Sequence, residues 1–199
     1  MTRLQTYAAL LAKWQPAINL VGKDTLPDLW RRHMLDSAQL APHIPAARPD
    51  GSPLTLVDLG SGAGFPGLVL AIMASDTNRQ WQVNLVESDM RKCAFLSTVA
   101  RETRTDVKIH PARIEKLAAF SADVVTARAL TPLESLLAYA EPFLMPSSHC
   151  LFLKGATAAD ELTAAAKSWK MTVEQLPSRS GPAGNLLHIR DISRVKSRP

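Results

Sequence analysis

The stretch LVDLGSGAGFPG, residues 56–67, decides the fold of this chain. It joins an apolar run, residues 54–59, to a loop that contains the pattern GxGxxG as residues 62–67. Glycines in such a loop allow positive φ and a close approach of the backbone to a ligand. In a parallel sheet covered by helices, ligands bind beyond the carboxyl ends of the strands. The stretch therefore predicts a ligand-binding loop, and the remaining question is which ligand it holds.

The chain after this boundary alternates between strand and helix patterns. Strands are predicted over residues 54–59, 81–87, 107–110, 122–128, 149–155, 171–176 and 185–192, and helices over 67–76, 90–103, 133–144 and 158–169. Such alternation is typical of a doubly wound, mostly parallel α/β sheet. The last two strands have no helix between them, so they predict a hairpin with one antiparallel strand.

Residues 1–45 carry helical patterns and no strand pattern. One helix is predicted from residue 4 to 18, ending or restarting at Pro16, and a second over residues 26–41. The segment IPAARPDGSP, residues 44–53, is rich in proline and marks a boundary. The predicted organisation is an N-terminal helical cap (1–45), a sheet domain (53–193) and a basic tail (194–199).

Composition indicates an ordinary globular chain. It has 199 residues, of which 46% are hydrophobic and 21% are charged. There is no run of about 18 apolar residues and no signal-peptide pattern, so we expect a cytoplasmic protein without membrane contact. Cys93 and Cys150 have no ligand spacing, which favours two buried thiols and no metal site.

The net charge of +5 is concentrated at the two ends of the chain. Residues 1–50 contribute +2, residues 51–166 contribute −2 and residues 167–199 contribute +5. Basic ends suit a polyanionic partner, because each phosphate contact releases counterions. A solubilising surface with a frayed basic tail explains the same charges, and composition leaves both readings open.

The residues around the loop favour one adenosine cofactor over another. Asp58 gives DLGSGAG, which resembles the first motif of S-adenosylmethionine-dependent methyltransferases, and Glu87 ends the second strand, where an acid binds ribose hydroxyls. An NAD-dependent enzyme needs a catalytic pair such as Tyr-xxx-Lys, and neither Tyr7 nor Tyr139 has a lysine four residues later. We therefore expect a Rossmann-like class I methyltransferase.

The stretch after the fourth strand bears on the methyl acceptor. TARALTPL, residues 126–133, has neither the Asn/Asp-Pro-Pro-aromatic motif of amine methyltransferases nor a nucleophilic cysteine. Arg128 directs a guanidinium toward the predicted site, or forms a salt bridge between strand and helix.

Seven blocks occur in an order that resembles the RsmG (GidB) family of bacterial ribosomal RNA methyltransferases. They are WQPAINL, RHMLDS, DLGSGAGFPGLVLAI, VESDMRKCAFL, RIEKL, VVTARALTPL and FLKG, and they cover nearly the whole chain. The resemblance implies transfer of a methyl group from S-adenosyl-L-methionine to guanine N7, at position 527 of 16S rRNA by the family's usual numbering. We further expect S-adenosyl-L-homocysteine as product, 16S rRNA as partner, either as naked RNA or within the 30S subunit, and a monomer.

The resemblance also assigns site residues. Carried over by position, the family's cofactor contacts fall on Gly60, Phe65, Ile114, Glu115 and Arg128. Ile114 and Glu115 would line the adenine.

The loop argument adds Gly62, Gly64 and Glu87 as cofactor contacts. Arg128 and Lys154 are the two predicted catalytic residues. Arg128 would hold guanine O6, a phosphate or the cofactor carboxylate. Lys154 would meet RNA phosphate or the target base, or is simply a lysine at a strand end.

Several basic and polar residues remain open at this stage. His33 and Asp36 are three residues apart, as a catalytic pair or, as we favour, part of a cap over the cofactor. Phosphate contacts without defined geometry are predicted for Arg31, Arg32, Arg194, Lys196 and Arg198. The alternative functions are methylation of another RNA or a small molecule, and a non-catalytic NAD(P)-binding regulator.

Overall fold

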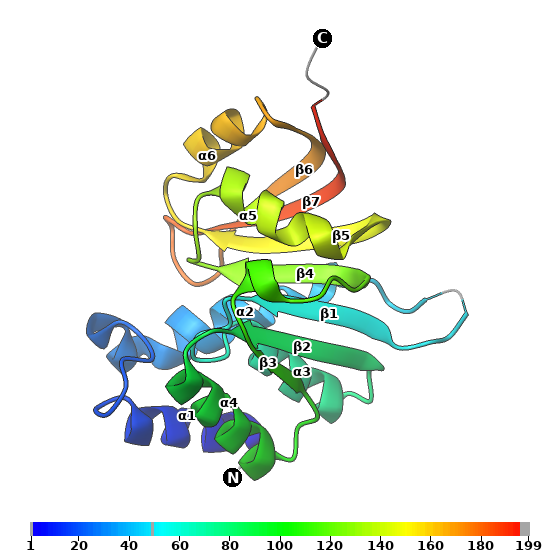
Figure 1. The fold of residues 1–199 in the computed structure, drawn as a ribbon. Helices are drawn as coiled ribbons and strands as arrows, with labels where there is room; N and C mark the ends of the chain where they lie inside the picture. Colours follow the sequence, from blue (N-terminus) through cyan, green and yellow to red (C-terminus); the bar gives the residue numbers. More distant parts are fainter. Residues whose placement is uncertain (1, 49, 196–199) are drawn as a thin grey trace.

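A computed structural model describes residues 2–48 and 50–195 as one seven-stranded sheet flanked by helices (Figure 1). The strands are β1 Leu54–Leu59, β2 Trp81–Glu87, β3 Lys108–Pro111, β4 Ala122–Arg128, β5 Leu144–Lys154, β6 Trp169–Pro177 and β7 Asn185–Arg194. The helices are α1 Arg3–Trp14, α2 Asp36–Ala38, α3 Gly67–Asp76, α4 Met90–Thr103, α5 Leu133–Ala140 and α6 Ala158–Ala165.

The strand order is β3-β2-β1-β4-β5-β7-β6. All neighbouring pairs from β3 to β5 are parallel, whereas β7 runs antiparallel to both β5 and β6. This confirms the predicted doubly wound sheet with one antiparallel strand. The sequence order reverses at β1 and β4, and this switch point is where such sheets bind ligands.

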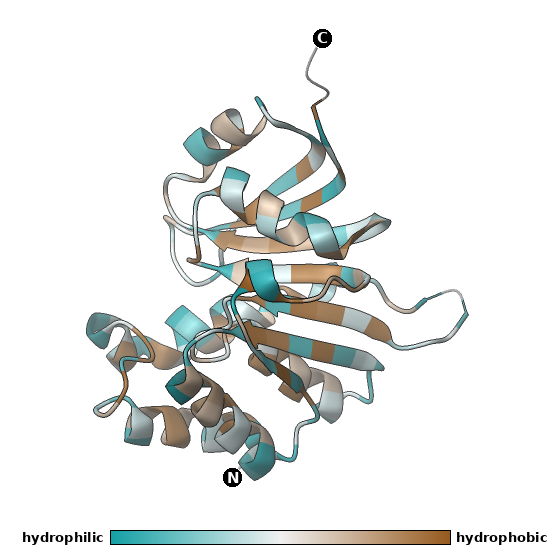
Figure 2. Cartoon of the chain, in the orientation of Figure 1, coloured by the Kyte–Doolittle hydropathy of each residue, from teal (hydrophilic) through white to brown (hydrophobic). Residues whose placement is uncertain are grey.

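Two hydrophobic cores cover the two faces of the sheet. On β1, Leu54 and Leu56 belong to the core under α1, α3 and α4, while Val57 and Leu59 belong to the core under α5 and α6. Figure 2 shows apolar residues running through the central strands. Strands buried on both faces explain the continuous apolar runs in the sequence.

Local patterning locates the central elements well and fails near the edges. Strands β1, β2 and β4 and helices α3 and α4 begin and end at the predicted residues. The helix predicted over 133–144 is wrong in its last turn, because a 3₁₀ turn at Glu141–Phe143 leads into β5. The helix predicted over 158–169 ends at Ala165, because Trp169 already begins β6.

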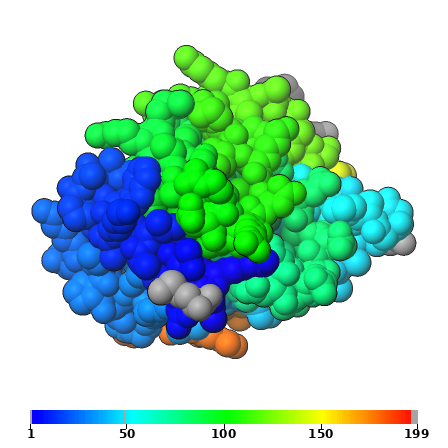
Figure 3. Space-filling model, turned by 90° about the horizontal axis from the view of Figure 1, so that it is seen from below, coloured from blue at the N-terminus to red at the C-terminus, as the bar shows by residue number. Residues whose placement is uncertain are grey.

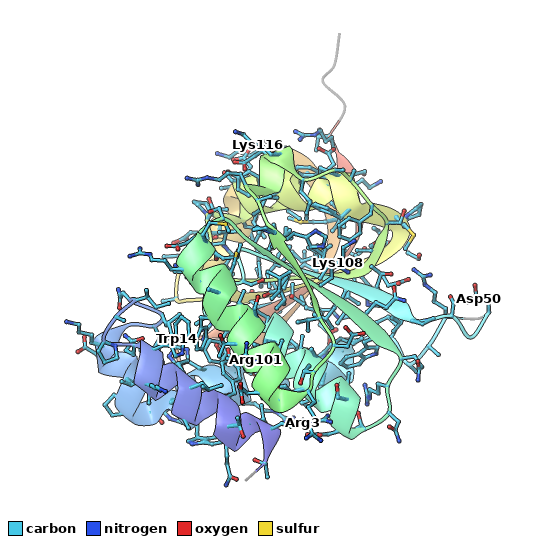
Figure 4. The ribbon with its side chains drawn as sticks, turned by 60° about the horizontal axis from the view of Figure 1, so that its bottom comes forward. Arg3, Trp14, Asp50, Arg101, Lys108 and Lys116 are labelled. Carbon is cyan, nitrogen blue, oxygen red and sulfur yellow. The ribbon has the colours of Figure 1, made fainter. Side chains whose placement is uncertain are left out.

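The N-terminal segment packs onto the sheet domain. Helix α1 begins with a capping box at Thr2 and buries Tyr7 and Leu11 in the same core as α3 and α4. In Figure 4, α1 lies alongside α4, and Figure 3 shows the N-terminal residues seated against this face. Helix α1 ends before Pro16, as predicted.

The second predicted helix, residues 26–41, is not continuous. It divides into a 3₁₀ segment at Lys23–Asp28, a π-helical turn at Trp30–Leu35 and the short α2. Pro27 lies inside the first segment and donates no backbone hydrogen bond there. The π-helical turn widens the backbone next to the site, a place where such turns often occur.

No helix among the described residues is long and apolar enough to span a membrane. Of the predicted basic tail, residues 196–199 lie outside the described residues, and with them Lys196 and Arg198.

Candidate active site

A cavity of about 990 Å³ opens at the carboxyl ends of the central strands. We divide its lining into two halves. The glycine-loop half consists of residues 60–63, Phe65, the end of β2 and residues 112–115 after β3. The cap half consists of residues 32–36, Arg128 and the β6–β7 loop, residues 178–184. Both halves contribute to the lining of the one cavity.

Backbone geometry builds the glycine-loop half. Gly60 and Gly62 have φ of 65° and 57°, and a Cβ on Gly62 would find its nearest neighbour 3.8 Å away. The Glu87 carboxylate accepts 2.8 Å hydrogen bonds from the backbone N–H of Gly62 and of Asp89. A carboxylate has about four acceptor positions, so Glu87 retains capacity toward the cavity.

Gly64 does not line the cavity, in contrast to its prediction as a cofactor contact. Its φ is 98°, and a Cβ there would lie 2.7 Å from the Tyr7 hydroxyl and 2.9 Å from Leu68 Cβ. The Tyr7 hydroxyl donates a hydrogen bond to the carbonyl of Ala63. Gly64 therefore makes room for α1 to press against the loop from behind.

Ile114 and Glu115 both line the cavity after β3. Ile114 is half-buried and packs against the core under α5. Hydrogen bonds with its own backbone and with the Tyr139 hydroxyl lower the pKa of Glu115. An apolar side chain beside an ionised carboxylate suits a flat heterocycle that carries polar edges.

Arg128 occupies the centre of the cap half. Its side chain is 18% exposed, and its guanidinium lies 4.9 Å above the Phe65 ring centroid. Nη1 donates a 3.1 Å hydrogen bond to the carbonyl of Arg32 and lies 3.7 Å from Asp36 Oδ2. Burial lowers the pKa of Arg128, and the carboxylate of Asp36 opposes this effect. Arg128 thus ties the cap to β4 and still faces the cavity.

His33 and Asp36 face different partners. His33 Nε2 lies 2.7 Å from Thr25 Oγ1, and its ring packs 5.0 Å from Phe65. Burial, together with the Arg128 charge, lowers the pKa of His33 to about 4. Asp36 Oδ1 accepts hydrogen bonds from Ser178 Oγ at 2.9 Å and Ser180 Oγ at 2.6 Å. The two residues support the cap and do not form a hydrogen-bonded pair.

Lys154 lines the cavity, but its ammonium is already bound. Nζ donates to the carbonyl of Thr131 at 2.5 Å and lies 2.7 Å from Glu161 Oε2, and the side chain is 6% exposed. This arrangement favours a lysine that fastens the end of β5 over one presented to an RNA phosphate.

Sequence reasoning missed the β6–β7 loop as part of the cavity. Ser180, Ala183 and Gly184 line it, and Gln39 fixes the loop by accepting from Arg179 N at 2.8 Å and donating to Ser178 Oγ at 3.0 Å. The stretch PSRSGPAG reads only as a turn, so no local signal distinguishes it from an ordinary hairpin.

Asp58 lies beneath the glycine loop and is 2% exposed. Its Oδ1 accepts a 2.7 Å hydrogen bond from Thr126 Oγ1, which links β1 to β4. Burial raises the pKa of Asp58 to about 6. Among the described residues, no group of three or more His, Cys, Asp or Glu side chains is arranged to hold a metal ion.

Comparison with known proteins identifies relatives along almost the whole chain. Residues 1–187 match the GidB family, described as rRNA small subunit methyltransferase G. A protein of that name from Paramagnetospirillum magneticum is 56% identical over 199 residues, covering 100% of this chain and 92% of its own length. One from Rhodospirillum centenum is 53% identical over 193 residues, covering 97% and 85%.

Solved structures share the fold at much lower identity. An S-adenosylmethionine-dependent methyltransferase from Aquifex aeolicus matches 82% of this chain and 92% of its own, with a TM-score of 0.61 and 12% identity. Aeropyrum pernix fibrillarin with natively bound S-adenosyl-L-methionine matches 78% and 76%, with a TM-score of 0.56 and 15% identity. These likenesses establish the class I methyltransferase fold.

Proposed function

The chain belongs to the rRNA small subunit methyltransferase G family, and from this premise we propose that it methylates guanine N7 of 16S rRNA, at position 527 in the family's usual numbering. The methyl donor in this proposal is S-adenosylmethionine. The acceptor is a guanine exposed in the small ribosomal subunit. We assign the glycine-loop half to binding of the cofactor and the cap half to binding of the target nucleotide.

One observation carries the cofactor assignment: the hydrogen bond between Glu87 and the backbone N–H of Gly62 at the edge of the cavity. It fixes a carboxylate with spare acceptor capacity beside Gly62, where a Cβ would have no neighbour closer than 3.8 Å. A ribose with two neighbouring hydroxyls fits this pair of features. In the proposal, Glu87 accepts from the ribose, and Ile114 and Glu115 flank the adenine.

When bound, S-adenosylmethionine supplies a methyl group on a positively charged sulfur. The guanine N7 lone pair needs no deprotonation, so the chain's own task is to hold the base in line and exclude water. This agrees with a cavity whose titratable groups are engaged by neighbours: Lys154 by Glu161, and Asp36 by two serines.

Arg128 is the residue best situated to orient the guanine. A guanidinium has five N–H donors, and the contacts to Arg32 and Asp36 leave others free. We assign them to guanine O6 or to the cofactor carboxylate, since N7 has to remain free to react. Arg128→Ala should lower methylation at least tenfold. Unchanged methylation together with unchanged cofactor affinity would contradict this role.

The decisive experiment supplies radiolabelled S-adenosylmethionine with free 16S rRNA and with 30S subunits, and maps the labelled nucleotide. The expected result is one labelled guanine whose methyl group is on N7. Label on another base, or on no rRNA, would overturn the proposal. A parallel titration with S-adenosylmethionine, S-adenosylhomocysteine and NAD(P) separates the enzyme from a nucleotide-binding regulator.

A further inference from the structure

Two arginines of the cap converge on one glycine of the β6–β7 loop. A Cβ on Gly181 would lie 3.3 Å from Arg32 Nη1 and 4.0 Å from Arg31 Nη1. Both guanidiniums therefore face the same small space above Gly181, which has no side chain to fill it. Like charges that converge repel each other unless an anion lies between them.

Carboxylates among the described residues compensate one charge of this pair and leave the other. Arg31 forms an ion pair with Asp28 and donates a 2.9 Å hydrogen bond to the carbonyl of Ser180. Within residues 2–48 and 50–195, the Arg32 side chain has neither a hydrogen bond nor an ion pair. The Asp36 carboxylate is turned away, toward Ser178, Ser180 and Arg128.

The space above Gly181 is built rigidly. The loop is closed by hydrogen bonds from Ser178 N to the Gly184 carbonyl at 2.9 Å and from Gly184 N to the Gly181 carbonyl at 3.1 Å. Asp36 and Gln39 fasten the same loop to the cap. The floor of the site is therefore fixed before an anion binds, and Arg31 is held in place by Ser180 and Asp28, which lowers part of the ordering cost.

The space above Gly181 lies next to the cavity in which the proposed reaction occurs. Arg32 and Ser180 both line the active-site cavity, on the half opposite the glycine loop. The Arg32 carbonyl also accepts from Arg128, the residue assigned to the target base. An anion above Gly181 would therefore lie beside the cap half of the cavity.

We propose that Arg31 and Arg32, over Gly181, form a phosphate-binding site that holds the RNA backbone next to the target guanine. The site rests on the proposed function, because it requires an RNA substrate. The planar guanidinium of Arg32 supplies paired donors to one phosphate, and Arg31 adds a second charge while it remains attached to the loop.

Two variants test this site, one by removing a positive charge and the other by adding a negative one. Arg32→Ala removes the uncompensated charge. Gly181→Asp leaves both arginines in place and supplies a carboxylate in the space that the phosphate would take. Arg101→Ala is the matched control, since Arg101 is 71% exposed on α4 and pairs only with its neighbour Glu102.

The measurement is the affinity for a 16S rRNA fragment containing the target loop, by fluorescence anisotropy at several salt concentrations. Loss of one phosphate contact should reduce the slope of log K against log salt by ~0.7 to 0.9. We expect this reduction, with about tenfold weaker binding, for Arg32→Ala and Gly181→Asp but not for Arg101→Ala. Arg32→Lys should recover most of the slope, because it restores the charge.

The measurements distinguish failure of the phosphate site from failure of the proposed function. Cofactor affinity within twofold of wild type, and an unchanged melting temperature, identify a folded protein with an intact glycine-loop half. A salt slope unchanged in both variants would overturn the phosphate site while leaving the RNA substrate in place. Wild-type protein that binds no rRNA at any salt concentration would overturn the proposed function and this site with it.

Discussion

The two halves of the cavity are constructed in different ways. The glycine-loop half is made largely of backbone groups from residues 60–63, completed by Glu87 through its bond to Gly62 and by Ile114 and Glu115 after β3. The cap half is made of side chains from three distant segments, and its central contact joins Asp36 to Ser178, 142 positions later in the chain. A contiguous motif suffices for the first half, whereas the second exists only once the chain has folded.

The two halves should therefore tolerate substitutions to different degrees. Backbone donors are insensitive to side-chain changes, so a loop of this kind can serve one cofactor in many enzymes. Side-chain contacts between distant segments can be exchanged one at a time, which allows the cap half to vary. Four substitutions test whether the two halves of the cavity act separately, and they follow in decreasing order of expected effect.

The largest effect should come from Gly64, where α1 packs against the glycine loop from behind. Gly64→Ala would place a methyl group 2.7 Å from the Tyr7 hydroxyl at a φ of 98°. Backbone strain and overpacking together should cost about 3 kcal/mol or more of unfolding free energy, measured in urea. Gly155→Ala is the control, since nothing lies within 4 Å of its Cβ position, and it should change stability by less than ~0.5 kcal/mol. Normal stability with weakened cofactor binding would return Gly64 to the glycine-loop half.

A second change acts within the glycine-loop half alone. Glu87→Gln turns an amide NH₂ toward the N–H of Gly62 or Asp89, so that two donors face each other. The affinity for S-adenosylmethionine should fall about 100-fold, in accord with the ~1–3 kcal/mol cost of an unsatisfied buried donor and a lost ribose contact. Calorimetric titration measures this, with the exposed Glu102→Gln as control. Cofactor affinity equal to wild type would remove Glu87 from the site.

A third change acts within the cap half alone. Asp36→Asn removes the ion pair with Arg128 while keeping an acceptor for Ser178 and Ser180. We expect about tenfold lower kcat/KM for rRNA, with cofactor affinity within twofold of wild type. Asp76→Asn, at an exposed pair with Arg3, is the control. Equal losses in both measurements would mean that the halves are not separable.

The smallest effect concerns pH. The pKa of His33 falls from 6.5 to about 4 on folding, so neutral His33 is favoured in the native state. This contribution to stability is complete above pH 6.5 and is lost as the pH falls through about 4. Glutamine does not titrate, so the wild type should exceed His33→Gln in unfolding free energy by less at pH 4 than at pH 7, measured by urea unfolding. A deficit that does not change with pH would contradict the burial of a neutral His33.

Asp58, beneath the glycine loop, titrates with the opposite sign. Its pKa rises from 3.8 to about 6, so its contribution is complete below pH 3.8 and is lost as the pH rises through about 6. Over the same interval, the two buried groups therefore partly cancel in the wild type, and only variants reveal either one.

The sequence predicts the fold because the decisive signals are local. Periods of apolar residues and the glycine loop locate β1, β2, β4, α3 and α4 to the residue. It fails where tertiary contacts decide the geometry. The π-helical turn at Trp30–Leu35 replaces a regular helix where the cap meets Arg128, and no periodicity encodes that change.

The same reasoning explains the site. Gly60, Gly62, Glu87, Ile114 and Glu115 line the cavity because the motif and the strand ends specify them.

Lys154 and Gly64 have different surroundings from those expected. Glu161 engages the lysine and Tyr7 crowds the glycine, and neither partner is near in sequence. Among the diffuse basic residues, Arg194 pairs with Glu141, while Arg31 and Arg32 meet at Gly181. Pairing partners, which the sequence does not reveal, distinguish these arginines.

The position of β7 has a consequence for how the chain is made. Of the seven described strands, β7 comes last along the chain and lies between β5 and β6, so β6 has no sheet neighbour until residues 185–194 emerge. During synthesis, β6 stays unpaired until β7 is available, so the sheet closes only when residues 185–194 have been made. A chain stopped before β7 would leave two strand edges unpaired and open to aggregation. Synthesis of the ten residues of β7 is thus the step that completes the sheet of the domain.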